Sequence, residues 1–115
     1  MNIVIYAREC KSLKDDISLE RQLATCLKYA QEHNFKIVGT YLDKDTTYFN
    51  NERQEFLKMI HDCYKGTFQG ILVFQANKFA RTNYERSLWK RDLNKNGIVL
   101  LYTNKTKRRC KNDKI

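Results

Sequence analysis

The stretch IVIYA at residues 3–7 is a nearly continuous apolar run, and it sets the pattern for the rest of the chain. Three similar runs, rich in β-branched and aromatic residues, follow at residues 35–42, 70–74 and 98–102. A short apolar run without polar alternation is typical of a strand that is buried on both faces. The four runs therefore predict four strands of one mainly parallel sheet.

Helical patterns separate these runs. Ser18 can cap a first helix, and Asn34 suits its end. A second helix is expected over residues 56–64, ending at Gly66, and a third over residues 84–93. Their apolar residues recur at helical spacing and should face the sheet. These positions are Leu19, Leu23, Cys26, Leu27 and Ala30, then Phe56, Leu57, Ile60 and Tyr64, then Tyr84, Leu88, Trp89 and Leu93.

Strands that alternate with helices imply a parallel sheet with helices on both faces. Because the crossovers of such units are right-handed, we expect a fold of the α/β class. It should be a small flavodoxin-like three-layer domain with a mainly parallel four-stranded sheet, in the strand order 2-1-3-4. Residues 1–103 would form this domain, and residues 104–115 are a polar tail with six Lys and Arg.

Composition narrows the classes of function. The chain has 115 residues and a net charge of +9, which favours a polyanionic partner, either nucleic acid or an anionic membrane surface. The four cysteines form no Cys-x-x-Cys pair and neither histidine is at metal-ligand spacing from them, so no metal or other cofactor is expected. The first apolar run is too short for a signal peptide or a membrane span, which predicts a cytoplasmic protein with reduced thiols.

Candidate chemistry lies where the first and third strands end. Ligands of open α/β sheets bind beyond the carboxyl ends of the strands, at the point where the strand order reverses. Arg8 and Cys10 follow the first strand, whereas Asn77, Lys78 and Arg81 follow the third. Cations around a nucleophile suit phosphoryl transfer, because they stabilise the phosphoryl oxygens and lower the pKa of a thiol. Alternatively, the cations are solvated loop residues and Cys10 is a small buried filler.

These residues also carry a resemblance to a family. The segment YAREC at residues 6–10 resembles the Tyr-x-Arg-x-Ser motif that opens the catalytic domains of serine recombinases, the resolvase, invertase and large-integrase class. The resemblance covers about residues 2–103, and its motifs occur in the family's order. The other similar segments are SLERQ at 18–22, FKIVG at 35–39 followed by Asp43, Glu52-Arg53 with Phe56 and Met59, KFARTNY at 78–84, and Leu93 to Ile98.

The resemblance implies a mechanism for these residues. Residue 10 would attack a DNA phosphate and form a covalent 5′-phosphoryl-enzyme link without a metal. Arg8, Arg53 and Arg81 would bind and stabilise the phosphoryl group. The partner would be double-stranded DNA, bound by a homodimer or tetramer. The whole implied set is Cys10, Arg8, Arg81, Lys78, Arg53, Asn77 and Gln22 for catalysis, with Gln22 and Asn77 holding hydrogen bonds, and Arg81, Lys105, Lys107, Arg108 and Arg109 for DNA binding.

The sequence departs from the family pattern at the site. Cys10 stands in place of the nucleophilic serine, and Asn77-Lys78 in place of Asp-Arg. Asparagine lacks a carboxylate that could act as an acid or base, and lysine keeps the charge but loses the planar fork of arginine. The tail at residues 104–115 would be the start of a truncated dimerisation helix or a basic tail on phosphates, and no DNA-binding domain is recognisable. We therefore expect impaired recombination.

Three other functions fit part of this pattern. A catalytically inactive relative could act as a DNA-binding or regulatory subunit of a mobile element, together with active recombinase subunits. A small cysteine phosphatase or arsenate reductase would need a Cys-x₅-Arg loop, but the sixth residue after Cys10 is Asp16, which would repel an oxyanion. A basic nucleic-acid-binding module without chemistry would bind DNA in a salt-dependent way that survives Cys10→Ala.

Overall fold

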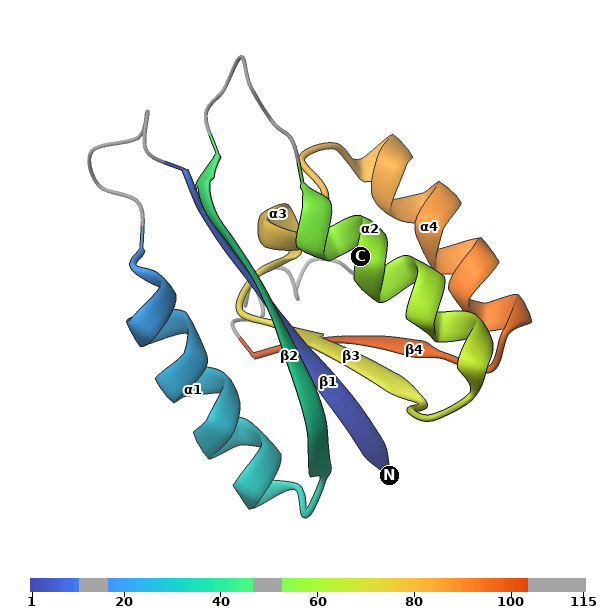
Figure 1. Ribbon diagram of the computed structural model, residues 1–115, viewed down its shortest axis with the longest axis horizontal. Coiled ribbons are helices and arrows are strands. Elements are labelled where there is room, and N and C mark those ends of the chain that lie inside the picture. Colours follow the sequence, from blue (N-terminus) through green and yellow to red (C-terminus); the bar gives the residue numbers. More distant parts are fainter. Residues whose placement is uncertain (11–16, 47–52, 104–115) are drawn as a thin grey trace, which may run out of the picture.

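Strands and helices alternate along the chain in a computed structural model that describes residues 1–10, 17–46 and 53–103 (Figure 1). The expected alternation is confirmed, with one additional turn of helix after the third strand. The elements are β1 (Asn2–Cys10), α1 (Leu19–Glu32), β2 (Lys36–Thr46), α2 (Gln54–Asp62), the 3-10 turn η1 (Cys63–Lys65), β3 (Gly70–Val73), α3 (Ala76–Phe79), α4 (Asn83–Lys95) and β4 (Val99–Tyr102).

The four strands form one sheet in the order β2-β1-β3-β4, with every neighbouring pair parallel, as predicted. β1 is central in this order, so both of its edges are paired: Ile5 lies opposite Thr40 of β2 and Leu72 of β3. Residues 3–7 of β1 are at most 2% exposed. A strand in that position needs apolar side chains on both faces, which explains the continuous apolar run.

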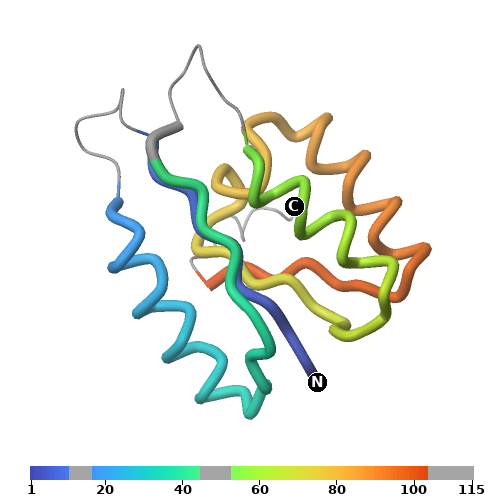
Figure 2. Tube along the Cα trace, viewed as in Figure 1, coloured from blue at the N-terminus to red at the C-terminus, as the bar shows by residue number. Residues whose placement is uncertain are grey.

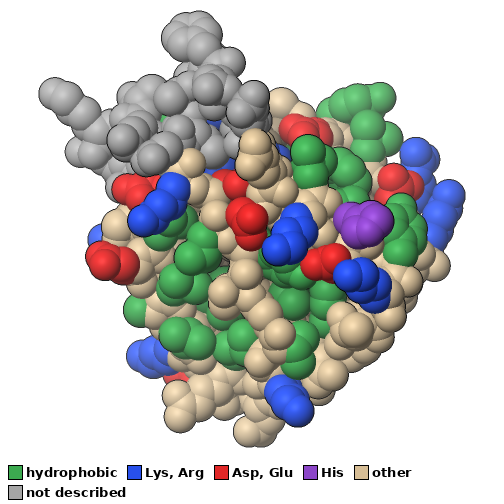
Figure 3. All heavy atoms as spheres, in the orientation of Figure 1, with side chains coloured by type: hydrophobic (Ala, Val, Ile, Leu, Met, Phe, Trp, Pro, Cys, Tyr) green, Lys and Arg blue, Asp and Glu red, His purple; other side chains and the backbone are tan. Residues whose placement is uncertain are grey.

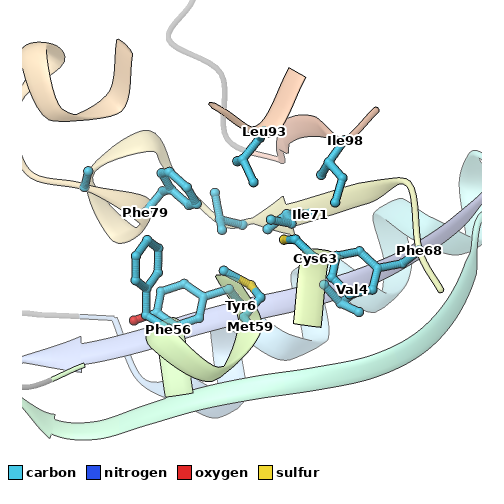
Figure 4. Close-up of a cluster of buried hydrophobic side chains, with 12 residues drawn as sticks. Val4, Tyr6, Phe56, Met59, Cys63, Phe68, Ile71, Phe79, Leu93 and Ile98 are labelled. Carbon is cyan, nitrogen blue, oxygen red and sulfur yellow. The ribbon is translucent and has the colours of Figure 1, made fainter. Parts of the chain in front are cut away.

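Helices cover both faces of the sheet, giving the three layers expected (Figures 1 and 2). Ile3 and Ile5 point to the α1 side, where they pack with Cys26, Ala30 and Leu72. The alternate residues of β1, Val4 and Tyr6, belong to a larger cluster on the side of α2, α3 and α4 (Figure 4). The two-residue period of the strand thus divides one apolar run between two cores.

Local signals fix where α1 and the turn after α2 end. The Ser18 hydroxyl oxygen accepts a hydrogen bond from the Arg21 amide at 3.2 Å and caps α1, as predicted. Asn34 adopts the left-handed conformation just beyond α1, with φ 58°, and Gly66 does the same after η1, with φ 72°. Both residue types tolerate this conformation, so both predicted stops are confirmed.

Two strands are longer than the sequence predicts. The predicted runs end at Ala7 and Leu42, but β1 continues to Cys10 and β2 to Thr46. Arg8 lies opposite Asp43 in this extension, and both side chains are buried. Charged residues are usually exposed to solvent. Here both side chains are buried because residues distant in the chain form hydrogen bonds with them. The one-turn helix α3 was not predicted, because four residues are too few to show a helical period.

The orientation of α4 also differs from expectation. Tyr84 and Leu88 were expected to face the sheet, but they are 75% and 38% exposed. Trp89 contacts the Phe56 ring of α2 edge-on, with the ring centroids 5.4 Å apart, and Leu93 is buried in the same cluster. These two contacts set the rotation of the helix. On the face of the molecule in Figure 3, hydrophobic and charged side chains are interspersed.

The predicted basic tail at residues 104–115 lies outside the described residues. Among the helices within residues 17–46 and 53–103, none combines the length and the apolar composition that a membrane span needs.

Met59 and Leu57 of α2 allow a matched test of the larger core. Met59 is fully buried, whereas Leu57 is 62% exposed. We expect Met59→Ala to lower the free energy of unfolding by about 2–5 kcal/mol, because it leaves a cavity. Leu57→Ala should change it by less than about 0.5 kcal/mol. Urea unfolding of both variants measures the difference, and equal losses would contradict the assigned orientation of α2.

Two buried thiols predict a loss of stability at high pH. Burial raises the pKa of Cys26 from 9.0 to about 12, and burial together with nearby Asp62 raises that of Cys63 to about 11. The unfolded chain loses these protons near pH 9, whereas the folded chain holds them to higher pH. Stability should therefore be unaffected by these groups below pH 9 and fall as the pH rises through 11. The decline should be shallower in Cys26→Ala, measured by urea unfolding at each pH.

Candidate active site

The ends of β1 and β3 meet through the side chain of Arg8. Its Nη2 donates a hydrogen bond to the Asn77 carbonyl at 2.6 Å, and its Nε donates to the Lys78 carbonyl at 3.4 Å. Arg8 is only 4% exposed, so these contacts satisfy a buried cation. The predicted meeting of the residues that follow strands one and three is confirmed, but the partners on α3 are backbone carbonyls.

Gln22 of α1 holds the backbone of the same residue. Its Nε2 donates to the carbonyls of Arg8 and Ile17, each at 2.9 Å, and its Oε1 accepts from the Arg8 amide at 3.3 Å. The side chain is completely buried. Gln22 thus connects α1 to β1 at Arg8. The structure places this predicted residue against the backbone of Arg8 and not against its guanidinium group.

Arg53 is the residue that precedes α2, and its side chain contacts β1 and α3. Its Nε donates to the Tyr6 hydroxyl at 3.2 Å, and its Nη2 donates to the Phe79 carbonyl. Its guanidinium carbon lies 3.8 Å from the centroid of the Phe56 ring. A weakly hydrated planar cation can stack on an aromatic ring in this way and remain charged when it is largely buried.

Asp43 and Tyr6 form a buried pair that the sequence did not single out as site residues. The Tyr6 hydroxyl donates to Oδ2 of Asp43 at 2.7 Å. The same carboxylate accepts from the amides of Glu55 at 3.0 Å and Phe56 at 3.1 Å. Asp43 thereby caps the N-terminus of α2 from a neighbouring strand. Its position directly after the run at residues 35–42, as Arg8 directly follows the run at residues 3–7, is the signal that could have identified it.

Desolvation and hydrogen bonding also affect the pKa of Tyr6. Burial raises the pKa of Tyr6, and Asp43 adds to the effect, whereas Arg53 opposes it. The tyrosine is therefore a neutral hydroxyl that donates to Asp43 and accepts from Arg53. The Tyr6 hydroxyl therefore connects the Arg53 guanidinium, which precedes α2, with the Asp43 carboxylate on β2.

Three predicted cations share one electrostatic environment. Burial lowers the pKa of Arg8, and the positive charges of Arg53 and Arg81 lower it further, whereas Tyr6 and Cys10 act in the opposite direction. Arg8 and Arg53 both donate to carbonyls of α3, which ends two residues before Arg81, and Cys10 lies two residues after Arg8 on β1. Cys10 is 4% exposed but belongs to neither of the two apolar clusters. Like charges held together in this way favour an anion at the site.

The remaining predicted residues are placed differently. Lys78 is buried, with 5% exposure, whereas the side chain of Asn77 is exposed. Within the described ranges, no three His, Cys, Asp or Glu side chains gather as a metal site would require. Five residues named in the sequence analysis lie outside the described residues. They are Asp16, which argues against a phosphatase loop, and the predicted DNA-binding residues Lys105, Lys107, Arg108 and Arg109.

Comparisons with known proteins show the family and the fold. The family model described as "Resolvase, N terminal domain" matches residues 3–115. The catalytic domain of TP901-1 integrase is similar in structure, with a TM-score of 0.80 and 23% identity over 90% of this chain and 78% of that one. A resolvase family site-specific recombinase from Streptococcus pneumoniae gives a TM-score of 0.79 and 23% identity over 90% and 72%.

A third similar structure is the catalytic domain of ISC1926 TnpA, an IS607-like serine recombinase. Its TM-score is 0.73 and its identity 20%, over 96% of this chain and 75% of that one. At these identities the likeness shows a shared fold. No curated protein matches the chain.

Substitutions at Asp43 and Tyr6 test the buried pair. Asp43→Asn replaces a carboxylate that accepts three hydrogen bonds with an amide whose NH₂ group would face donors. We expect it to lower the free energy of unfolding by about 1.5–3 kcal/mol, the range for hydrogen bonds to charged groups. Tyr6→Phe should cost about 1 kcal/mol, because one hydroxyl is removed. If Asp43→Asn proved neutral in urea unfolding, the carboxylate would not be the cap.

Proposed function

The chain belongs to the resolvase family, and from this premise we propose that it cleaves and rejoins DNA strands in site-specific recombination. The observation that carries the proposal is that Arg8, two residues before Cys10 on β1, and Arg53 both donate to backbone carbonyls of residues 77–79, next to Arg81. Three permanent cations suit the charge of a phosphoryl group in transfer. A thiol beside them supplies a nucleophile.

The reaction that we propose for this chain is the one that the family resemblance implies, with Cys10 as the nucleophile. The Cys10 thiolate attacks the phosphorus of a DNA phosphodiester, a phosphorus–sulfur bond forms, and the bond to the 3′ oxygen breaks. The 3′ oxygen leaves as a hydroxyl after taking up a proton, and the 5′ phosphoryl group remains on the enzyme. Rejoining is the reverse: a 3′ hydroxyl attacks the phosphorus and the thiolate leaves. Arg8, Arg53 and Arg81 would stabilise the charge on the phosphoryl oxygens in both directions.

Other candidate residues take supporting roles. Lys78 would add a positive charge without the bidentate grip of an arginine. Gln22 would keep the backbone of Arg8 in place, and Asn77 would contribute a hydrogen bond but no proton transfer. The phosphorus–sulfur bond is weaker than a phosphorus–oxygen bond, and the thiolate is a good leaving group. We therefore expect covalent intermediates to be short-lived and recombination to be slower than with serine.

The partner in this proposal is double-stranded DNA, bound by a homodimer or tetramer in the cytoplasm. The net charge of +9 supports a polyanionic partner. Arg81 would contact the phosphate to be cut. The segment 104–115 would add contacts outside the catalytic domain of residues 1–103, through Lys105, Lys107, Arg108 and Arg109.

A second candidate is an inactive relative that regulates active recombinase subunits or binds DNA for a mobile element. Cys10 and Asn77 favour it, because the family's serine and a carboxylate are both missing from the site. Both candidates predict DNA binding by the same arginines. They differ only in whether position 10 forms a bond to phosphorus.

Covalent trapping distinguishes them. A nicked suicide DNA substrate, which loses a short strand after cleavage, is incubated with the unmodified chain, Cys10→Ser and Cys10→Ala, and adducts are separated on denaturing gels. We expect adducts with the first two and none with Cys10→Ala. Adducts from Cys10→Ser alone would identify an inactive relative with a repairable site. No adduct from any form, with DNA binding retained, would contradict strand cleavage by this domain.

A further inference from the structure

Arg86 on α4 is a further arginine that contacts the segment carrying Arg81. Its Nη1 donates a hydrogen bond to the Ala80 carbonyl at 2.5 Å, and its Nη2 donates to Oδ1 of Asn83. We propose that Arg86 is a positioning residue that holds the peptide between Ala80 and Arg81 and so sets where Arg81 meets the phosphate. This inference rests on the proposed function.

The segment that bears Arg81 is short and anchored on both sides. Only three residues, 80–82, separate α3 from α4. On one side the Ala80 amide donates to the Ala76 carbonyl at 3.2 Å. On the other side the Thr82 hydroxyl oxygen accepts from the Glu85 amide at 3.1 Å and caps α4. The direction in which Arg81 leaves the backbone therefore depends on the orientation of the Ala80–Arg81 peptide.

Ala80 is completely buried, and its carbonyl group belongs to that peptide. A buried carbonyl needs a hydrogen-bond donor, and Arg86 supplies one. Rotation of the peptide would break this bond and leave a polar group without compensation. Arg86 thus resists the rotation that would displace the next residue, Arg81.

The position of Arg86 in its own helix supports a tertiary role. It is the fourth residue of α4, near the N-terminus, where the helix dipole disfavours a positive charge. Glu85, one residue earlier, is the kind of side chain that a helix start prefers. The helix dipole gives no reason for an arginine here. The hydrogen bond to Ala80 does.

Arg86 also completes a series of contacts along α3 and the residue after it. Arg8 donates to the carbonyls of residues 77 and 78, Arg53 to that of residue 79, and Arg86 to that of residue 80. Arg8 and Arg53 have a proposed role on the phosphate, whereas Arg86 acts from α4. Its charge opposes the rise that burial causes in the pKa of Tyr102, the last residue of β4.

The contact is tested first without DNA. The carbonyl ¹³C shift of Ala80 and the amide shift of Arg81 are compared by NMR among the unmodified chain, Arg86→Ala, Arg86→Lys and Arg91→Ala. Arg91 is an exposed arginine on the same helix and serves as the control. We expect both signals to move in Arg86→Ala, to move less in Arg86→Lys, which keeps one donor, and to stay in Arg91→Ala. Unchanged signals in Arg86→Ala would overturn the inference.

The second experiment measures the rate of adduct formation at saturating suicide substrate. The substitutions are introduced into the parent form that gives adducts, which is either the unmodified chain or Cys10→Ser. Arg86→Ala should slow adduct formation, and Arg81→Ala combined with Arg86→Ala should be no slower than Arg81→Ala alone. Additive losses, or an Arg86→Ala rate equal to that of the parent, would overturn the positioning role.

Measurement of DNA affinity at several salt concentrations tests a third possibility, namely that Arg86 binds DNA directly. If Arg86 itself contacted a phosphate, Arg86→Ala would weaken the salt dependence of binding while leaving the saturated rate unchanged, and the inference would be wrong. If neither parent forms adducts, the proposed function fails, and the NMR arm alone still decides whether Arg86 holds the peptide. Thermal unfolding by circular dichroism verifies that each variant is folded.

Discussion

The hydrogen bonds from Arg8 to the carbonyls of Asn77 and Lys78 join the two strands on which the candidate site is built. Parallel strands bring their carboxyl ends to the same edge, but they do not by themselves orient the segments beyond. A buried guanidinium must find acceptors, and the end of a one-turn helix offers carbonyls that lack a partner within the helix. Gln22 secures the other side of Arg8 by holding its backbone. Arg8 and Gln22 therefore hold the candidate site in place and are also among its predicted residues.

A cluster of cations has an energetic consequence. The charges of Arg53 and Arg81 act on Arg8, and the burial of Arg8 and Arg53 removes water that would screen them. In the free protein, backbone carbonyls provide the compensating partial negative charge for Arg8 and Arg53. An anion would compensate far better, because it carries a full charge. A site preorganised in this way is less stable than a neutral core of the same size, and this cost is typical of functional sites.

The network around Asp43 shows how the second strand participates. Asp43 caps α2, accepts the Tyr6 hydroxyl, and through it reaches Arg53. One carboxylate thus connects β2, β1 and the start of α2. The Phe56 ring completes the arrangement by packing under Arg53 and against the rings of Phe79 and Trp89. The polar site and the larger apolar core consequently share residues, so packing changes in that core should reach the arginines.

The sequence by itself determined the strand order, the helix stops at Asn34 and Gly66, and the meeting of the segments that follow the first and third strands. These follow from apolar periodicity, local backbone preference and the rule that parallel strands end together. The tertiary structure alone decided that Arg8 and Asp43 extend the strands, that α4 turns Tyr84 outward, and that Asn77, Lys78 and Phe79 contribute carbonyls. Those outcomes depend on partners distant in the chain, which satisfy buried charges and fix the rotation of helices, and no local pattern encodes such partners.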